Sequence, residues 1–183
     1  TVEGRDFACH RLVLAAGSQF FEGKYCGSGA AMVAEQPQLP QTSAAAFAAC
    51  LDFLYAGCCS VGEGELVAVL HAANFLGVPA LERSAAGALA ARLAPENALA
   101  VWSVAERLTS VPQLEEAAKE TALAAFEELG ESLLEAPLAQ VEALVSDDWL
   151  TARSEEAVFS LVARVAEKQR PAEAALLAVL RHL

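Results

Sequence analysis

Residues 66–76 read Leu-Val-Ala-Val-Leu-His-Ala-Ala-Asn-Phe-Leu, and this stretch decides the class of fold. Its apolar residues recur every three or four positions, which is the spacing of one face of an α-helix. Gly77 and Pro79 then interrupt the pattern. We therefore expect an amphipathic helix over residues 65–75 that buries one side. The buried side is predicted to consist of Leu66, Val69, Leu70, Ala73 and Leu76.

Helical signals continue from this stretch to the C-terminus. Proline is favoured in the first turn of a helix, and four prolines occupy such positions. No strand pattern follows Pro40, so we expect an all-helical chain after residue 94. Trp102 shares a helical face with Leu99 and Ala105, which predicts that it lies in the core. The expected helices cover residues 80–93, 95–108, 112–129, 137–145, about 155–168 after an N-cap at Ser154, and 171 onward.

The N-terminal side of the opening stretch is mixed. Residues 2–9 predict a β-hairpin with a turn at Gly4, and residues 36–41 predict a short edge strand. Short helices are expected over 11–16, ended by Gly17, over 19–25, capped by Ser18, and over 44–55, capped by Ser43. The predicted fold is thus α+β: a small α/β domain at residues 1–93, then an all-α domain of helical pairs at 94–183.

Composition narrows the classes of function. The chain has 183 residues, 55% of them hydrophobic, and a formal net charge of −12. Such acidity argues against nucleic acid as a partner, because binding to a phosphate backbone relies on Lys and Arg. The five cysteines are odd in number and lack the spacing of a disulfide framework. No signal-peptide pattern or bilayer-length apolar run is present, so we expect a soluble intracellular protein, cytoplasmic or nuclear.

Six strings, taken in order along the whole chain, resemble the BTB/POZ domain followed by a BACK domain of the kelch-like adaptor proteins. The BTB part is recognised by a strand followed by His-Arg and Leu-Ala and then a serine with paired aromatics. No kelch repeat, with its period of about 50 residues, occurs within the sequence. The matching strings are residues 7–21, 53–57, 70–76, 95–106, 146–159 and 170–183.

The resemblance implies a protein-interaction module rather than an enzyme: a substrate adaptor of a cullin-3 RING ubiquitin ligase. In this family a hydrophobic residue two positions before a glutamate touches cullin-3, and Val33 and Glu35 fit that motif. The implied partners are the cullin-3 N-terminal region, a second BTB chain, and a protein substrate held through a domain that this sequence does not contain. The family's N-terminal helix and first strand have no counterpart here, so we expect weakened self-association. The alternative is a BTB scaffold or oligomerisation module without cullin binding, in transcriptional or cytoskeletal regulation.

Candidate sites of other kinds are weak in this sequence. His10 beside Cys9 is interpreted as a structural residue that bonds to the backbone. Cys58 and Cys59 are adjacent rather than in the C-x-x-C spacing of a zinc site, and no second cluster completes a ligand set. No nucleophile motif or phosphate-binding glycine loop is present. We therefore predict no catalytic residue, no metal and no cofactor.

Overall fold

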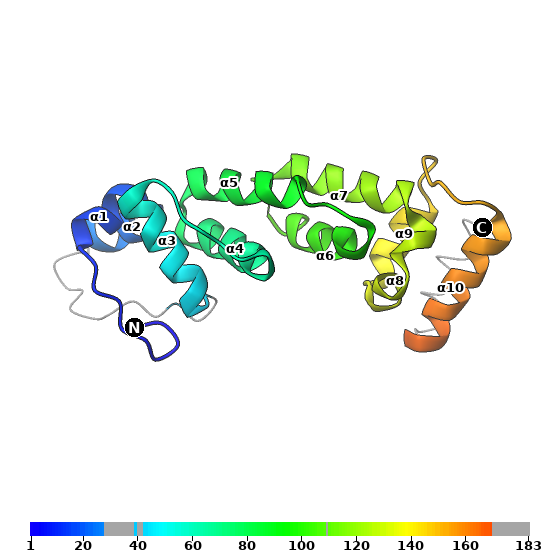
Figure 1. The fold of residues 1–183 in the computed structure, drawn as a ribbon, viewed down its shortest axis with the longest axis horizontal. Helices are drawn as coiled ribbons and strands as arrows, with labels where there is room; N and C mark the ends of the chain where they lie inside the picture. The colour runs from blue at the N-terminus through cyan, green and yellow to red at the C-terminus, as the bar shows by residue number, and fades with distance from the viewer. Residues whose placement is uncertain (28–38, 40–41, 109, 170–183) are drawn as a thin grey trace. The chain divides into compact units, whose positions relative to one another are not determined.

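The computed structural model describes residues 1–27, 39, 42–108 and 110–169, and these residues divide into two compact units, 1–89 and 90–183. Helices dominate the described residues of both units (Figure 1). In those residues no helix is both long enough and apolar enough to cross a membrane.

The first unit holds two packed helix pairs. Its helices are α1 (Arg11–Gly17), α2 (Gln19–Cys26), α3 (Ala44–Ala56), α4 (Leu66–Leu76) and α5 (Pro79–Ala90), with a 3-10 turn at Glu63–Glu65. Helix α1 packs on α2 and α3, and α4 packs on α2 and α3. The predicted apolar face of α4 is confirmed, because all five of its residues are at most 5% exposed.

The second unit opens with a helical pair, α6 (Pro95–Ala105) and α7 (Pro112–Ala124), which pack extensively on each other. Helices α8 (Glu131–Glu135), α9 (Leu138–Val145) and α10 (Glu155–Gln169) follow, and α8 contacts both α6 and α10. Pro95 opens α6 as predicted, and the Asn97 side chain holds the entering turn by accepting from the Ala94 N–H at 3.0 Å. Trp102 is 5% exposed, which confirms its place in the core.

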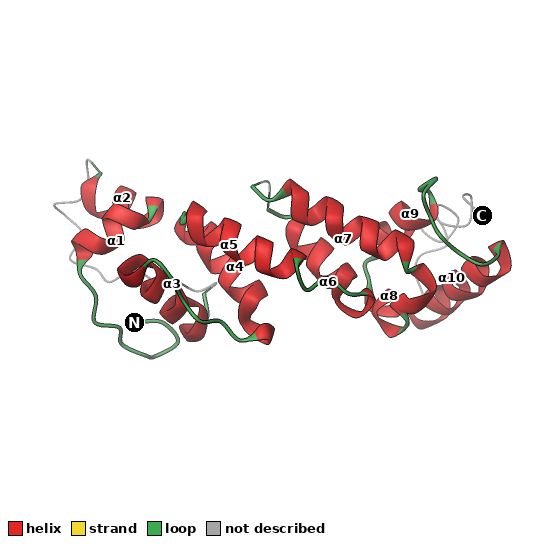
Figure 2. Ribbon diagram, turned by 45° about the horizontal axis from the view of Figure 1, so that its top comes forward, coloured by secondary structure: helices red, strands yellow, loops and turns green. Residues whose placement is uncertain are grey.

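The predicted α+β character is confirmed only in its helical part. Among the described residues, strand pairing is limited to a single bridge between Val2 and Arg5, and Figure 2 draws no strand. Glu3 and Gly4 form the tight turn between them, with φ of 47° and 76°. The hairpin predicted over residues 2–9 is thus confined to residues 2–5, and most of the edge strand predicted over 36–41 lies outside the described residues.

Three helices, α5, α6 and α7, end before the predicted residue. Helix α1 does end at Gly17, as predicted, and a Cβ there would lie 2.4 Å from Leu54 Cδ2, so a larger residue would require the Leu54 side chain to move. The helix that starts at Pro112 ends at Ala124 rather than near 129, and a 3-10 turn at Phe126–Leu129 follows. The helices predicted to reach residues 93 and 108 end at Ala90 and Ala105. Helix α8 was not predicted at all.

Candidate functional site

The start of α2 is tied to the end of α4 by Ser18. Its hydroxyl accepts from the Phe21 N–H at 3.3 Å, which caps α2, and donates to the Leu76 carbonyl, which no later turn of α4 can satisfy. The Gln19 N–H adds a bond of 3.1 Å to the Gly77 carbonyl. Gly77 has φ +63, and a Cβ there would lie 2.8 Å from Gln19 Cβ. The orientation of α2 in the first unit is therefore fixed by buried polar contacts.

The predicted cullin-binding residues, Val33 and Glu35, lie outside the described residues. Their proposed role stays a prediction. The chain is well anchored on both sides of them: α2 ends at Cys26, and Leu39 is 6% exposed and accepts from the Thr42 N–H at 3.2 Å. Ser43 then caps α3, accepting from the Ala46 N–H at 3.1 Å.

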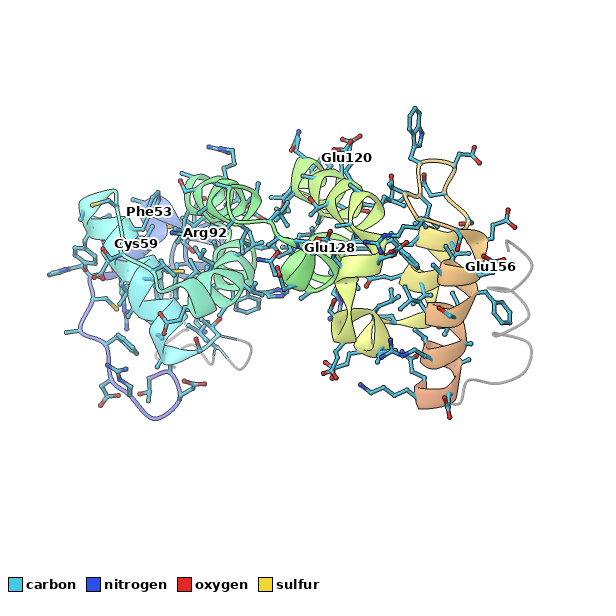
Figure 3. The ribbon with its side chains drawn as sticks, turned by 45° about the vertical axis from the view of Figure 1, so that its right-hand side comes forward. Phe53, Cys59, Arg92, Glu120, Glu128 and Glu156 are labelled. Atoms are coloured by element: carbon cyan, nitrogen blue, oxygen red, sulfur yellow. The ribbon has the colours of Figure 1, made fainter. Side chains whose placement is uncertain are left out.

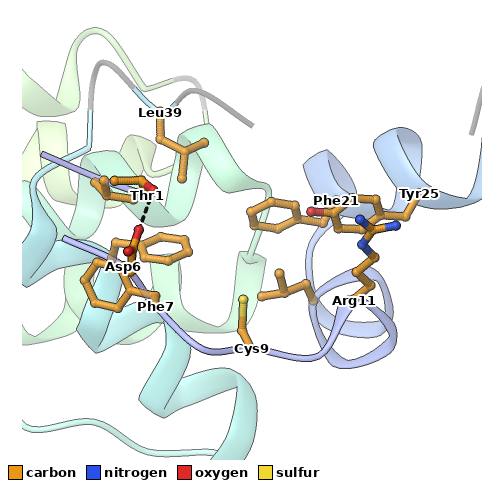
Figure 4. A pocket seen from close by; sticks show the side chains of 11 residues that line it. Thr1, Asp6, Phe7, Cys9, Arg11, Phe21, Tyr25 and Leu39 are labelled. Carbon is orange, nitrogen blue, oxygen red and sulfur yellow. Dashed lines mark hydrogen bonds between the residues drawn. The ribbon is translucent and has the colours of Figure 1, made fainter. Parts of the chain in front are cut away.

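A hollow of about 280 Å³ lies beside α1 and α2 in the first unit (Figure 4). Its wall includes the buried apolar side chains Leu14 and Phe21, while Cys9 is exposed at its edge. The Arg11 guanidinium lies over the Tyr25 ring, 5.4 Å from its centroid, and burial raises the pKa of the Tyr25 hydroxyl. These groups can receive an apolar side chain, but they offer no hydrogen-bonded pair of acid and base for catalysis.

His10 joins the start of α1 to the end of α3 through Tyr55. The His10 N–H donates to the Tyr55 hydroxyl at 2.7 Å, and His10 Nδ1 lies 2.8 Å from the same oxygen. The structural interpretation of His10 fits this arrangement, although its side-chain partner is a hydroxyl and not the backbone. Tyr55 is 48% exposed and Leu12 on α1 is 81% exposed, so the surface near this junction carries uncovered apolar groups.

Among the described residues, the cysteines and histidines form no recognisable reactive centre. Burial raises the pKa of Cys50 to about 12, so its thiol stays protonated at neutral pH. Cys59 follows α3 in a loop, where Figure 3 labels it, and burial and the neighbouring Asp52 raise its pKa too. Within the described part of the chain, no three His, Cys, Asp or Glu residues come together to hold a metal ion.

The second unit carries an ion pair that sequence reasoning did not foresee. Lys119 Nζ on α7 lies 2.7 Å from Asp147 Oδ2, and the Trp149 N–H donates to Asp147 Oδ1 at 3.0 Å. These two bonds, the lysine's first, lower the pKa of Asp147. Through these two bonds Asp147 ties the loop after α9 to α7.

Trp149, whose N–H bonds to Asp147, carries the most exposed aromatic ring among the described residues of this unit. Trp149 is 83% exposed and borders a hollow of about 440 Å³ next to Glu116 and Glu120 of α7. Figure 3 shows Glu120 pointing away from the helix that carries it. Large exposed aromatic rings are enriched in binding interfaces, so this edge of α7 can serve protein contacts.

Comparisons with known proteins match two successive stretches of this chain to two domain families. Residues 1–93 match the BTB/POZ domain family, and residues 98–183 match the family described as BTB And C-terminal Kelch. Kelch-like protein 35 of Mus musculus is 38% identical over 176 residues, covering 92% of this chain and 30% of that protein. Kelch-like protein 21 of Rattus norvegicus is 34% identical over 173 residues, covering 94% of this chain and 29% of that protein.

A further relative, Kelch-like protein 38 of Homo sapiens, is 28% identical over 160 residues. The chain thus spans less than a third of the length of the curated relatives that it matches. Neither matched domain family is one of enzymes. The BTB/POZ match is followed along this chain by the BTB And C-terminal Kelch match, and the chain belongs to the kelch-like family of BTB–BACK proteins.

Proposed function

We propose that this chain is the cullin-binding part of a substrate adaptor for a cullin-3 RING ubiquitin ligase, acting in the cytoplasm or nucleus. The observation that carries the proposal is the match of consecutive BTB and BACK families over almost the whole chain. The adaptor does no bond chemistry. It raises the effective concentration of a bound substrate at the ligase, and that task needs binding surfaces rather than an acid, a base or a cofactor.

The contact with cullin-3 is assigned to the segment after α2, with Val33 giving apolar burial and Glu35 a charge partner. Ser18 supports this assignment, because it anchors the helix from which that segment departs. The opening helices of the second unit would extend the contact. Their outward side chains include the exposed Glu96, Glu116 and Glu120, which suits a basic partner surface.

The test is calorimetric titration of the cullin-3 N-terminal region into the parent chain and its variants. Val33→Ala is expected to weaken binding roughly thirtyfold, about 2 kcal/mol, as truncation of an interface anchor does. Glu35→Lys is expected to cost more, since it sets a like charge against the cation that Glu35 meets. Glu167→Lys, the same change on an exposed residue of α10, is the matched control and should bind like the parent.

Thermal melts of all three variants separate lost binding from lost structure. Equal affinity of Glu35→Lys and the parent would disprove the motif assignment. A folded parent that does not bind cullin-3 would disprove the adaptor role and favour a BTB scaffold that works without a cullin.

A further inference from the structure

The loop after α9 carries the exposed indole of Trp149 on a backbone that is fastened to α7 on both sides of it. On one side Asp147 pairs with Lys119 at 2.7 Å, and its other carboxylate oxygen accepts from the Trp149 N–H at 3.0 Å. On the other side the Thr151 N–H donates to the Leu123 carbonyl at 3.1 Å. Little backbone freedom is therefore left to lose when a partner covers the ring, which suits an anchor of a binding surface.

The hollow of about 440 Å³ beside this indole combines an aromatic ring with charged groups. We call it the Trp149 hollow. Its second apolar residue is Leu123, which is 6% exposed. The other side chains that line it are all charged: Glu116, Lys119, Glu120 and Asp147. A ligand that fits this lining must itself present both a flat face and a charge.

Two carboxylates of the Trp149 hollow have no cation to balance them within the described part of the chain. Glu116 and Glu120 are exposed and lie four positions apart on α7, so they share one face of that helix. Lys119 is three positions from Glu116, but its ammonium group is held by Asp147. No ion pair between described residues includes Glu116 or Glu120. Like charges at this spacing repel each other, and a cation supplied from outside would relieve that repulsion.

An arginine side chain matches both parts of this lining. Its guanidinium group is planar, so it can stack on an indole while its N–H groups donate to carboxylates beside the ring. Lysine offers a point charge without the flat face. An apolar side chain would cover the indole, but it would also remove the two carboxylates from water without giving them a partner. An acidic or phosphorylated segment would be repelled by the same carboxylates.

We propose that the Trp149 hollow binds an arginine side chain presented by a partner protein. The guanidinium group lies on the Trp149 indole and donates to Glu116 and Glu120. The pair of Lys119 and Asp147 holds the loop in place and does not contact the arginine. The inference goes beyond the proposed function, because it holds for any partner that carries the arginine and does not require cullin-3.

Selection from a phage library of random dodecapeptides tests this site, with the intact chain as bait and its Trp149→Ala variant as the subtraction step. Peptides that bind the parent but not Trp149→Ala should contain an arginine. They are titrated calorimetrically into the parent and into the double variant Glu116→Gln with Glu120→Gln, which should bind them about tenfold more weakly or worse. The double variant Glu131→Gln with Glu167→Gln, at exposed positions of α8 and α10, is the matched control and should bind like the parent.

Two further comparisons separate an arginine site from a merely sticky aromatic ring. Replacing the arginine of a selected peptide by lysine should weaken binding to the parent about threefold or more, since the flat face and one of the N–H donors are lost. Phe159→Ala removes another exposed aromatic ring, 54% exposed on α10, and should leave the affinity unchanged.

Thermal melts of all variants check the fold, and exposed substitutions of this kind should change stability little. The proposal is overturned when no peptide distinguishes the parent from Trp149→Ala, or when the peptides that do so lack arginine. It is equally overturned when the variant without the Glu116 and Glu120 carboxylates binds as tightly as the parent, since apolar contact alone then covers the indole. Should a variant lose its fold, the arginine-to-lysine comparison in the parent chain decides by itself.

Discussion

Ser18→Ala should destabilise the BTB unit much more than an ordinary loss of a helix cap. Removing a serine N-cap costs about 1 kcal/mol. At Ser18 the hydroxyl also donates to the Leu76 carbonyl in a buried site, where Ser18 is 2% exposed. Leaving a buried carbonyl unsatisfied costs a further ~1–3 kcal/mol. We therefore expect Ser18→Ala to lower the free energy of unfolding by about 2–4 kcal/mol.

Ser43→Ala provides the matched comparison. Ser43 caps α3 through the single bond from Ala46 N–H, is only half-buried, and has no second carbonyl partner among its hydrogen bonds. Its removal should cost about 1 kcal/mol. In a unit of this size 1 kcal/mol shifts the melting temperature by about 4–8 °C.

Melting followed by circular dichroism at helical wavelengths is the appropriate assay, and Ser18→Ala should shift the midpoint at least twice as far as Ser43→Ala. Equal shifts would refute the reasoning, because they would mean that the Leu76 carbonyl finds another donor and that Ser18 acts only as a cap.

Three further outcomes are expected. Trp102→Ala should lose about 3–5 kcal/mol of stability in urea denaturation, whereas Trp149→Ala should unfold like the parent; similar losses would contradict their burial. Iodoacetamide at neutral pH should modify Cys58 and spare Cys50, whose pKa is near 12, as mass spectrometry of the folded protein can check; labelled Cys50 would contradict its burial. Because the pKa of Asp147 is lowered on folding, its contribution to stability is present above the ordinary aspartate pKa and is lost as the pH falls through the folded value; Asp147→Asn should flatten that acid-side decline in melting temperature, and an unchanged decline would contradict the assignment.

Much of the helical fold was predictable because one-sided burial imposes a period on the sequence. The buried face of α4 and the core position of Trp102 both follow from apolar residues spaced three or four apart. Prolines marked helix starts reliably at Pro95 and Pro112, since a first-turn residue needs no N–H for the helix. These signals come from neighbouring residues in the sequence, so they do not depend on what the helix packs against.

The sequence did not predict features that depend on tertiary contacts or on elements too short to show a period. Gly17 ends α1 as predicted, but its close approach to Leu54, 37 positions away, cannot be inferred from its sequence neighbours. Helix α8 has five residues, too few to show a period of 3.6. The break of α7 at Ala125, with φ −120° and ψ 35°, occurs among strong helix formers and so leaves no compositional mark.

The rule that apolar side chains are buried and polar ones exposed fails at particular residues of the structure, and the candidate interaction surface at Trp149 is one such place. An apolar residue on the exposed side, such as Trp149 at 83%, and a polar residue on the buried side, such as Gln140 at 3%, both raise the free energy of the isolated fold. A chain selected only for stability would replace the first with a polar side chain and the second with an apolar one. A partner that covers the indole recovers the first of these free-energy costs on binding. For the proposed adaptor, such a local loss of stability is the structural sign of a binding surface.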